Sequence, residues 1–458
     1  MSPHRPLPEG PLVAFYGDDY TGSSAAMEAL AFAGLDTVLF LAPPTPERLR
    51  TFVAYRGIGI AGVARSRDPD WMDRNLPPVF ELTRSLNAPV VHYKVCSTFD
   101  SAPHIGSIGR AIDIAAGLFD GWIPMVVGDP GMGRFQSFGH LFALAQGKGY
   151  RLDRHPTMSK HPVTPMDESD LGRHLAKQTD KPVGLVDFVA MKRGQADARL
   201  ADALASGARV VSLDVLDEET LIEAGRLVWE RGGEQVFTVG SQGLEAALAA
   251  YWRASGLLPE KKPASLVGSV DRIACVSGSV SPVTASQIAY SVSHGYTGIR
   301  IDATKAVDEP AWENEIGHVS RDALRALSEG SNPLVFTAAG PDDPAVAALR
   351  QAVATAGVSA ETVNDRIGSG LGRVLDTVVR EAKLRRAVIS GGDTSSHAAS
   401  MLGIDALTAI APVAPGSPLC RAHSTDPTRD GLEIALKGGQ VGGDDFFCAV
   451  RDGASQQT

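Results

Sequence analysis

The sequence predicts an α/β protein made of two doubly wound α/β domains. Three observations support this prediction. Short apolar runs, typical of buried strands, alternate with stretches of helical periodicity along the chain. Most of these runs end in polar turns that contain glycine. Near the middle, GLLPEKKPASLVGSVD at 256–271 has proline, lysine and serine in place of periodic apolar residues, which indicates a linker.

The first domain, predicted over residues 1–262, begins with a strand, a loop, a helix and a strand in quick succession. The expected order is a strand at 12–16, the turn GDDYTG, a helix at 23–33 and a strand at 37–41. Further strands are expected at 89–93, 125–127, 183–186 and 236–239, before the turns KVCSTFDS, GDPGMGR, an acidic turn and GSQG. Ligands of doubly wound sheets bind beyond the carboxyl ends of the strands, so chemistry is expected at these turns.

The second domain, predicted over residues 263–458, repeats this layout. Strands at 273–276, 334–337 and 387–389 lead into SGSVSP, AAGPDD and SGGDTSS, and residues 446–450 are expected to form a closing strand. The glycines of IGSGLGRVLD, near Gly368, are interpreted either as a loop before a helix or as a tight interdomain turn.

The composition excludes several classes of protein. The 458 residues are 44% hydrophobic and 21% charged, which is enough to bury two cores. A net charge of -10 argues against a general nucleic-acid or membrane binder, because both surfaces repel an acidic protein. No apolar run approaches the roughly 20 residues of a membrane helix. The four cysteines form no C-x-x-C pair, which favours a reducing cytoplasm over a disulfide framework or a zinc ribbon. Whether the chain forms a homo-oligomer stays open.

Two aspartates, Asp18 and Asp19, follow the first strand and precede a helix. A carboxylate at this place can accept a proton from a substrate hydroxyl, while free N–H groups of the helix hold a substrate carboxylate. The alternative is that one aspartate caps the helix and its neighbour is solvated.

The turn KVCSTFDS combines one cation, several hydroxyls and one acid. Lys94 can hold an anionic oxygen, and Ser97 and Thr98 can hydrogen-bond substrate hydroxyls. Asp100 can orient those hydroxyls or act as a base. A capped polar turn without a ligand is the alternative. In the later turn GDPGMGR, Arg134 can form a bidentate clamp on a carboxylate.

In the second domain, SGSVS at 277–281 and SGGDTSS at 390–396 both follow apolar strands. Their glycines permit close approach of a phosphate, their hydroxyls donate to it, and the next helix N-terminus adds positive potential. They form a candidate nucleotide cradle, or else two ordinary turns. Asp393 can bind magnesium or cap a helix, and the spacing does not decide between these roles. No G-x-x-x-x-G-K-[ST], protein-kinase signature or metal-ligand histidine spacing occurs, and His161 is kept as a candidate substrate contact.

Several stretches together resemble the four-carbon acid sugar kinases, formerly an uncharacterised family, whose known members act on threonate or oxo-tetronates. The stretches are GDDYTG, YKVCSTFDS, SKHPVTPMDESDLGRHLAKQT, VSGSVSPVTASQI, SGGDTSS and LKGGQVGGDDFF, in this order, and they span the chain from Val13 to Val450. The sequence departs from the family pattern at SSAAMEAL after DDYTG, at Asp393 where glutamate is frequent, and at CRAHSTDPTRD. These departures bear on substrate identity more than on phosphoryl transfer.

The resemblance implies a sugar-acid-binding domain at 1–262, a nucleotide-binding domain at 263–458, and a substrate and nucleotide cleft between them. The implied substrate contacts are Asp18, Asp19, Lys94, Ser97, Thr98 and Asp100. The implied ATP contacts are Ser279, Ser281, Gly391, Gly392, Asp393, Thr394, Ser395 and a glycine at Gly438 or Gly439. The metal ligands are left unassigned.

The predicted activity is ATP- and Mg²⁺-dependent phosphorylation of a hydroxyl of a small sugar acid, such as threonate or 3-oxo-tetronate. We expect the substrate carboxylate at a helix N-terminus or on Lys94 and Arg134, and Asp19 or Asp100 as the base. One alternative is an NAD-dependent sugar-acid dehydrogenase, which needs a G-x-G-x-x-G loop with an acid about 20 residues later, and none occurs. The other is a non-catalytic sugar-acid-binding module, which would release no ADP.

Overall fold

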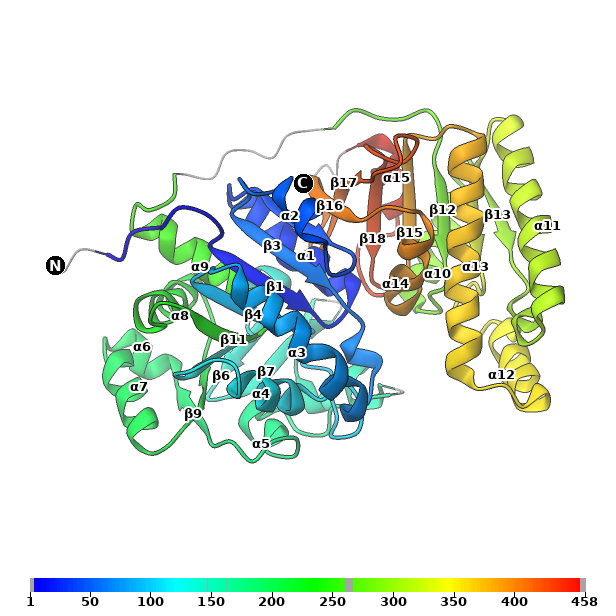
Figure 1. Cartoon of the computed structure of the whole chain (residues 1–458). Helices are drawn as coiled ribbons and strands as arrows, with labels where there is room; N and C mark the ends of the chain where they lie inside the picture. The colour runs from blue at the N-terminus through cyan, green and yellow to red at the C-terminus, as the bar shows by residue number, and fades with distance from the viewer. Residues whose placement is uncertain (1–3, 146, 162, 260–266, 454–458) are drawn as a thin grey trace. The chain divides into compact units, whose positions relative to one another are not determined.

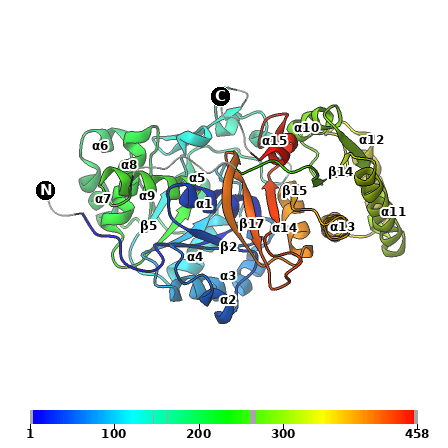
Figure 2. The same ribbon diagram turned by 90° about the horizontal axis from the view of Figure 1, so that it is seen from above.

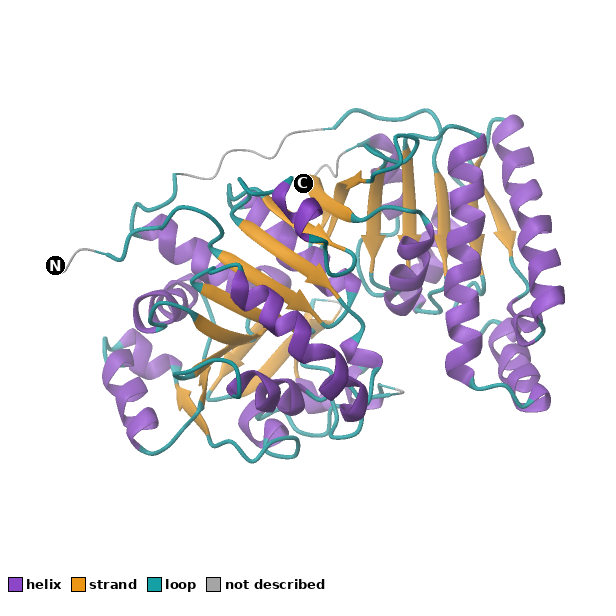
Figure 3. Ribbon diagram, viewed as in Figure 1, coloured by secondary structure: helices purple, strands orange, loops and turns teal. Residues whose placement is uncertain are grey.

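The computed structural model describes residues 4–145, 147–161, 163–259 and 267–453, and for Asp393 and Thr394 it describes the backbone alone. The centre of the predicted linker, 260–266, therefore lies outside the described residues. The chain divides into two compact units, Met1–Val38 with Pro43–Lys262, and Leu39–Ala42 with Pro263–Thr458. Helices and strands alternate in each unit (Figures 1 and 3). The predicted α/β fold class is confirmed.

The sheet of the first unit is parallel throughout, in the strand order β3-β1-β4-β11-β5-β10-β9. The strands are β1 (Val13–Gly17), β3 (Gly57–Ala61), β4 (Val90–Lys94), β5 (Ile123–Val126), β9 (Val183–Val186), β10 (Val210–Leu213) and β11 (Val236–Gly240). Most read as short apolar runs because both faces of a parallel sheet are covered. The strands that the sequence predicted are present with small shifts, whereas β3 and β10 had no predicted counterpart.

Helices cover both faces of this sheet. On one face, α9 (Gly243–Ala254) packs against α1 (Tyr20–Phe32) and α8 (Glu218–Arg231); on the other, α3 (Pro69–Ser85) packs against α4 (Ile108–Ala116) (Figure 1). The aromatic rings of Tyr16, Phe80, Tyr93 and Phe237 meet beneath α3. Each buried ring of this size stabilises the fold by roughly 1.5–3 kcal/mol. The shorter helices are α2 (Pro46–Arg50), α5 (Leu171–Leu175), α6 (Phe188–Lys192) and α7 (Ala196–Ala205).

A small antiparallel sheet follows β5. It consists of β6 (Arg134–Ser137), β7 (His140–Ala145) and β8 (Lys148–Arg151). The fully buried Asp214, just beyond β10, accepts hydrogen bonds from the backbone N–H groups of Phe138 (2.6 Å) and Gly139 (2.9 Å). This carboxylate therefore fixes the β6–β7 turn, and with it the hairpin that begins at Arg134.

The second unit has the strand order β13-β14-β12-β15-β18-β17-β16, parallel from β13 to β18. The strands are β12 (Ala274–Ser277), β13 (Tyr296–Arg300), β14 (Asn332–Phe336), β15 (Arg386–Ser390), β16 (Ala406–Ala414), β17 (Ser417–His423) and β18 (Glu433–Lys437). The end of β2 (Thr37–Phe40) belongs to this unit, where Leu39 and Phe40 pair antiparallel with Leu407 and Ala406.

Helices also cover both faces of the second sheet. Figure 2 shows α10 (Pro282–Val292) and α15 (Phe446–Asp452) on one face, with α13 (Ala360–Glu381) and α14 (Gly392–Met401) on the other. Two more helices, α11 (Glu309–Ser328) and α12 (Pro344–Ala356), complete the unit. No helix among the described residues is long and apolar enough to cross a membrane.

A buried ion pair anchors the amino ends of β15 and β18. Arg386 is fully buried, and its Nε donates to Glu433 Oε2 over 2.7 Å. Its remaining N–H groups donate to the carbonyls of Val450 (2.8 Å), Arg451 and Gly268. One guanidinium therefore ties two strands, the C-terminal helix and the entry to β12 together.

Two predictions in this unit are wrong. Residues 446–450 form α15 instead of a closing strand, because a short apolar run alone does not distinguish a buried helix from a strand. The glycines near Gly368 lie inside α13, so they form neither a loop nor an interdomain turn. A Cβ on Gly370 would lie 2.5 Å from the Trp312 ring of α11, and one on Gly372 2.6 Å from the Ala398 carbonyl of α14. These glycines permit close helix packing.

Candidate active site

Four neighbouring strands of the first unit end at one edge of the sheet. Gly17, Lys94, Gly240 and Val126 lie in register across β1, β4, β11 and β5. The turns that follow these strands therefore gather at one place, as the sequence predicted for GDDYTG, KVCSTFDS, GDPGMGR and GSQG.

Asp18 and Asp19 are both buried and share one cation, Arg65. Arg65 donates to Asp18 through Nη2 (2.6 Å) and Nε (3.2 Å), and its Nη2 also donates to Asp19 Oδ1 (2.7 Å). Burial raises the pKa of Asp18, aided by the charge of Asp19 and opposed by Arg65. For Asp19 burial acts in the same direction, but the charges of Arg65 and Lys94 outweigh it and lower the pKa.

Asp19 also caps α1. Its Oδ1 accepts from the Gly22 backbone N–H (2.9 Å) and its Oδ2 from the Thr21 hydroxyl (2.6 Å). The capping alternative therefore describes Asp19 well, although its neighbour Asp18 is paired with Arg65 and not solvated.

Lys94 reaches the first turn of α1. Its side chain is buried, and Nζ donates to the Val95 carbonyl (2.6 Å). A Cβ on Gly22 would lie 2.3 Å from Asp19 Oδ1, 2.9 Å from Lys94 Nζ and 3.4 Å from Arg65 Nη2. Glycine at this position thus makes room for the Asp19 carboxylate, which lies where two cations and a helix N-terminus converge.

The loop after Lys94 has a strained backbone next to Asp100. Phe99 is buried and adopts a left-handed φ of 57°, which bulky residues rarely adopt. The hydroxyl of Thr98 donates to Asp100 Oδ1 (2.7 Å), and no described residue donates to Oδ2. Ser97 is half-buried beside Cys96, whose pKa is raised to about 11 by burial and by Asp100.

Arg134 keeps part of its guanidinium unpaired. Its Nη1 donates to the carbonyls of Met132 (3.1 Å) and Gly133 (3.3 Å). Its Nε is buried, and neither Nε nor Nη2 has an acceptor among the described residues. Burial lowers the pKa of Arg134, and the nearby Cys96, Asp100 and Asp129 oppose this shift. The edge formed by Nε and Nη2 is the one that matches the two oxygens of a carboxylate.

Sequence reasoning missed three residues at this edge, Arg65, Asp129 and Gln242. Arg65 follows β3, a strand that was not predicted. Asp129 accepts a hydrogen bond from Gln242 Nε2 (2.9 Å), and burial raises the pKa of Asp129. Asp129 and Gln242 lie in the turns GDPGMGR and GSQG, which follow strands, so their position was the available signal.

His161, the remaining candidate substrate contact, is engaged within its own loop. It accepts hydrogen bonds from the N–H (3.1 Å) and the hydroxyl (3.0 Å) of Thr164.

The predicted nucleotide loops also meet at one edge, in the second unit. Ser277, Ser390 and Lys437 lie in register at the carboxyl ends of β12, β15 and β18. SGSVS, SGGDTSS and the turn KGGQVGG therefore start side by side.

Hydroxyls link the first and third of these loops. Ser281 caps α10 by accepting from the Thr284 N–H (3.0 Å), and its hydroxyl donates to the Gly439 carbonyl. Thr284 donates to the same carbonyl over 3.1 Å or to the Ser279 hydroxyl over 3.0 Å. A Cβ on Gly439 would lie 2.8 Å from the Ser279 oxygen, so the two loops are in contact.

The loop SGGDTSS turns sharply into α14. Gly391 has a φ of 124°, and Ser395 donates to its carbonyl over 2.5 Å. A Cβ on Gly392 would meet nothing within 4 Å. Ser390 is buried, and its hydroxyl has no partner among the described residues. The side chains of Asp393 and Thr394 lie outside the described part of the chain, and no cluster of three His, Cys, Asp or Glu residues elsewhere in that part forms a metal site.

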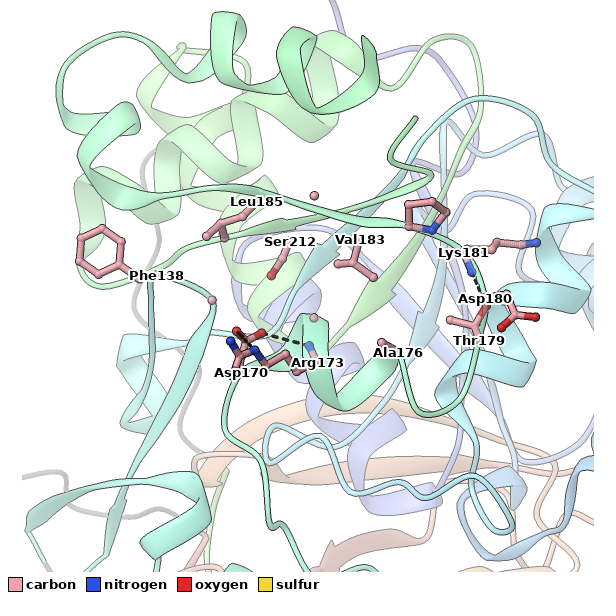
Figure 4. A pocket seen from close by; sticks show the side chains of 14 residues that line it. Phe138, Asp170, Arg173, Ala176, Thr179, Asp180, Lys181, Val183, Leu185 and Ser212 are labelled. Carbon is pink, nitrogen blue, oxygen red and sulfur yellow. Dashed lines mark hydrogen bonds and ion pairs between the residues drawn. The ribbon is translucent and has the colours of Figure 1, made fainter. Parts of the chain in front are cut away.

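A separate pocket of about 530 Å³ opens beside β9 (Figure 4). Phe138, Asp170, Arg173 and Leu185 are among its lining residues, and none of the predicted site residues lines it. Its polar groups are engaged locally, since Asp170 accepts from the Arg173 N–H (3.1 Å) at the start of α5. The strand-end clusters are therefore the better candidates for chemistry.

Comparison with known proteins adds a family and relatives. Residues 13–248 match a sugar-binding N-terminal domain, and residues 274–447 match a nucleotide-binding C-terminal domain. The chain is 50% identical to the 3-oxo-isoapionate kinase of Paraburkholderia graminis, over 97% of this chain and 95% of that protein. It is 31% identical to the 3-oxo-tetronate kinase of Methylobacterium radiotolerans (95% and 97%) and 29% identical to that of Cupriavidus necator (96% of each). These relatives favour neither the dehydrogenase nor the non-catalytic alternative.

Two solved structures share the fold. A Haemophilus influenzae protein superposes with a TM-score of 0.69 at 24% identity, covering 96% of this chain and 99% of the other. A Salmonella typhimurium protein superposes with a TM-score of 0.73 at 23% identity, covering 95% and 98%.

Proposed function

We propose, because this chain belongs to the four-carbon acid sugar kinase family, that it transfers the γ-phosphoryl group of ATP to a hydroxyl of a 3-oxo sugar acid. The relatives' names, 3-oxo-isoapionate kinase and 3-oxo-tetronate kinase, both describe 3-oxo acids. The 50% identity with the first, against about 30% with the others, makes 3-oxo-isoapionate the first candidate substrate and 3-oxo-tetronate the second.

The observation that carries this proposal is the guanidinium edge of Arg134 that has no acceptor among the described residues. A buried guanidinium N–H without an acceptor costs free energy of roughly 1–3 kcal/mol, and a substrate carboxylate removes that cost by accepting from it. A bidentate pair fixes the orientation of the substrate as well as binding it. Arg134 therefore holds the substrate carboxylate, and the nearby Asp100 faces the rest of the substrate.

We assign the base to Asp100 rather than Asp19. Both oxygens of Asp19 already accept hydrogen bonds, from Gly22, Arg65 and Thr21. Among the described residues only Thr98 donates to Asp100, to one oxygen, which leaves the other oxygen able to take the hydroxyl proton. Asp18 and Asp19 then hold Arg65 in place, and Asp19 caps α1.

Lys94 and Arg65 supply positive charge on the other side of the site. Their cationic groups converge beside the Asp19 carboxylate at the N-terminal turn of α1. There they attract the 3-oxo oxygen of the substrate, while Ser97 and Thr98 contact its hydroxyls. We further propose a cytoplasmic location, which fits four cysteines that are all free.

The second unit offers a fitting cradle for the ATP phosphates. The candidate contacts follow strands that end at one sheet edge. They are Ser279, Ser281, Gly438, Gly439 and the loop at 391–395, which includes Gly392, Asp393 and Thr394. The buried Ser390 hydroxyl, which has no partner in the part of the chain that is described, and the open space at Gly392 suit a polar ligand there. ATP supplies the phosphoryl group, and Mg²⁺ offsets its charge.

The test is ADP release by the purified protein with ATP, Mg²⁺ and a panel of sugar acids. We expect turnover with 3-oxo-isoapionate at the highest kcat/KM, lower values with 3-oxo-tetronate, and the lowest with threonate. Incubation with NAD⁺ or NADH and the same acids should change no absorbance at 340 nm. Nicotinamide oxidation or reduction, or no ADP release with any acid, would refute the proposed activity.

A further inference from the structure

We propose that Lys437 is a positioning residue for the nucleotide, which ties SGSVS, the turn after β18 and α10 together through Thr284 and binds a proton when the phosphates arrive. This inference rests on the proposed nucleotide binding. Lys437 was not among the residues that the sequence predicted, and it contacts the loops that were.

Lys437 contacts both α10 and the turn after β18. Its side chain is fully buried, and Nζ donates to Thr284 Oγ1 (3.2 Å) and to the Gly438 carbonyl (2.9 Å). The third N–H position has no acceptor among the described residues. Thr284, also fully buried, lies within hydrogen-bond distance of both the Ser279 hydroxyl and the Gly439 carbonyl. One ammonium thereby reaches two loops through one hydroxyl.

The charge on Lys437 decides which way the Thr284 hydroxyl points. A protonated ammonium only donates, so Thr284 must accept from it and turn its own proton toward Gly439 or Ser279. A neutral amine has a lone pair that attracts the Thr284 proton instead. Loss of the lysine proton therefore removes the hydrogen bond that Thr284 of α10 donates to Gly439 or to Ser279.

Nothing charged among the described side chains offsets burial around Lys437. Thr284 of α10 and the ring of Phe446 of α15, 5.8 Å from Nζ, face it, and Ser390 is its register partner on β15. Asp444 and Asp445 in the following turn are exposed. Burial alone lowers the pKa of Lys437 to about 7.

Bound phosphates change this balance. Their negative charge favours the ammonium, so the pKa of Lys437 should rise on binding and the protein should take up a proton. Because the bound form holds the proton more tightly, nucleotide affinity should be highest below pH 7 and fall as the pH rises from about 7 through the higher pKa of the complex.

Isothermal titration calorimetry of ATP with Mg²⁺ at pH 8, in buffers of different ionisation enthalpy, measures this proton directly. The wild type should take up roughly 0.5–0.9 proton per nucleotide, since a shift of two units around this pH changes the occupancy by that amount. Lys437→Met, which keeps the length but not the charge, should take up none and bind ATP about 10–100-fold more weakly, as expected for a lost charged hydrogen bond. Exposed Lys383→Met is the matched control and should behave as wild type.

Thr284→Val provides a second variant in case Lys437→Met does not fold. It keeps the lysine but removes the hydroxyl that connects Lys437 to Ser279 and Gly439, so ATP binding should weaken while proton uptake remains. Wild-type binding with the same enthalpy in every buffer, or full uptake by Lys437→Met, would overturn the inference while leaving the kinase proposal intact. Absence of ATP binding and of ADP release by the wild type would instead remove the proposed function, and this inference with it.

Discussion

Lys94 and Lys437 occupy equivalent places in the two units. Each is the last residue of a central parallel strand, each side chain is at most 1% exposed, and each ammonium donates to the carbonyl of the next residue. Their surroundings differ. Lys94 lies beside Asp19 and near Arg65, whereas Lys437 faces a hydroxyl, a carbonyl and an aromatic ring.

The two edges suit ligands of different chemistry. The edge of the first unit is a network of full charges, which suits a small sugar acid whose carboxylate and hydroxyls must each be recognised. The edge of the second unit is built from glycine, hydroxyls and backbone, which suits the repeated oxygens of a phosphate chain.

The largest effect should come from Asp100→Asn in the charged site. The amide cannot take the hydroxyl proton, so we expect kcat to fall about 10²–10⁴-fold, the range attributed to general-base catalysis. ATP binding, measured by calorimetry, should not change. Asp19→Asn is the paired variant; if it loses more kcat than Asp100→Asn, the assignment of the base is reversed.

Glu433→Gln should produce the largest loss of stability in the second unit. It leaves the buried Arg386 without its carboxylate, and breaking such a pair costs about 3–5 kcal/mol of unfolding free energy. Urea unfolding followed by circular dichroism measures the loss. Exposed Glu329→Gln should stay within about 0.5 kcal/mol of the wild type. Equal stability of the two variants would contradict the anchoring role of Arg386.

Arg134→Lys should show whether the substrate carboxylate needs the two parallel N–H groups of the guanidinium or only a positive charge. Lysine keeps the positive charge but cannot present two parallel N–H groups, so kcat/KM for the sugar acid should fall about 10–100-fold. KM for ATP should stay unchanged, because Arg134 belongs to the first unit. Arg173→Lys, at an exposed position, is the control. Full activity of Arg134→Lys would place the carboxylate elsewhere.

The smallest effects should come from a matched pair of glycine substitutions. In Gly22→Ala the new Cβ crowds Asp19 and Lys94, and in Gly439→Ala it crowds Ser279. We expect KM to rise roughly 3–10-fold, for the sugar acid in the first variant and for ATP in the second, as local overpacking costs on the order of 1 kcal/mol. Gly317→Ala, with only a flexible Arg321 nearby at 3.5 Å, should change neither. A rise in the same KM for both variants would contradict the assignment of the two sheet edges to different ligands.

The sequence predicted the turns better than the side-chain networks inside them. GDDYTG, KVCSTFDS, SGSVS and SGGDTSS were found because an apolar run followed by a glycine-bearing polar turn is a local pattern. Arg65 and Lys437 were missed because their importance depends on neighbours far along the chain, Asp18 and Thr284. The strand predicted at 446–450 failed for the same reason, since packing against α10 decides that this apolar run is helical.

Two of the three glycines of α13 have a consequence for the loop SGGDTSS. Gly368 and Gly372 let α14 approach so closely that a Cβ on either would strike His397 or Ala398. Each glycine costs a helix about 1 kcal/mol relative to alanine, so the close approach is maintained against the intrinsic preference of the helix. Because SGGDTSS continues directly into α14, the spacing between α13 and α14 sets the position of this loop. A larger side chain at Gly368 or Gly372, outside the loop itself, would push α14 away from α13 and displace the loop.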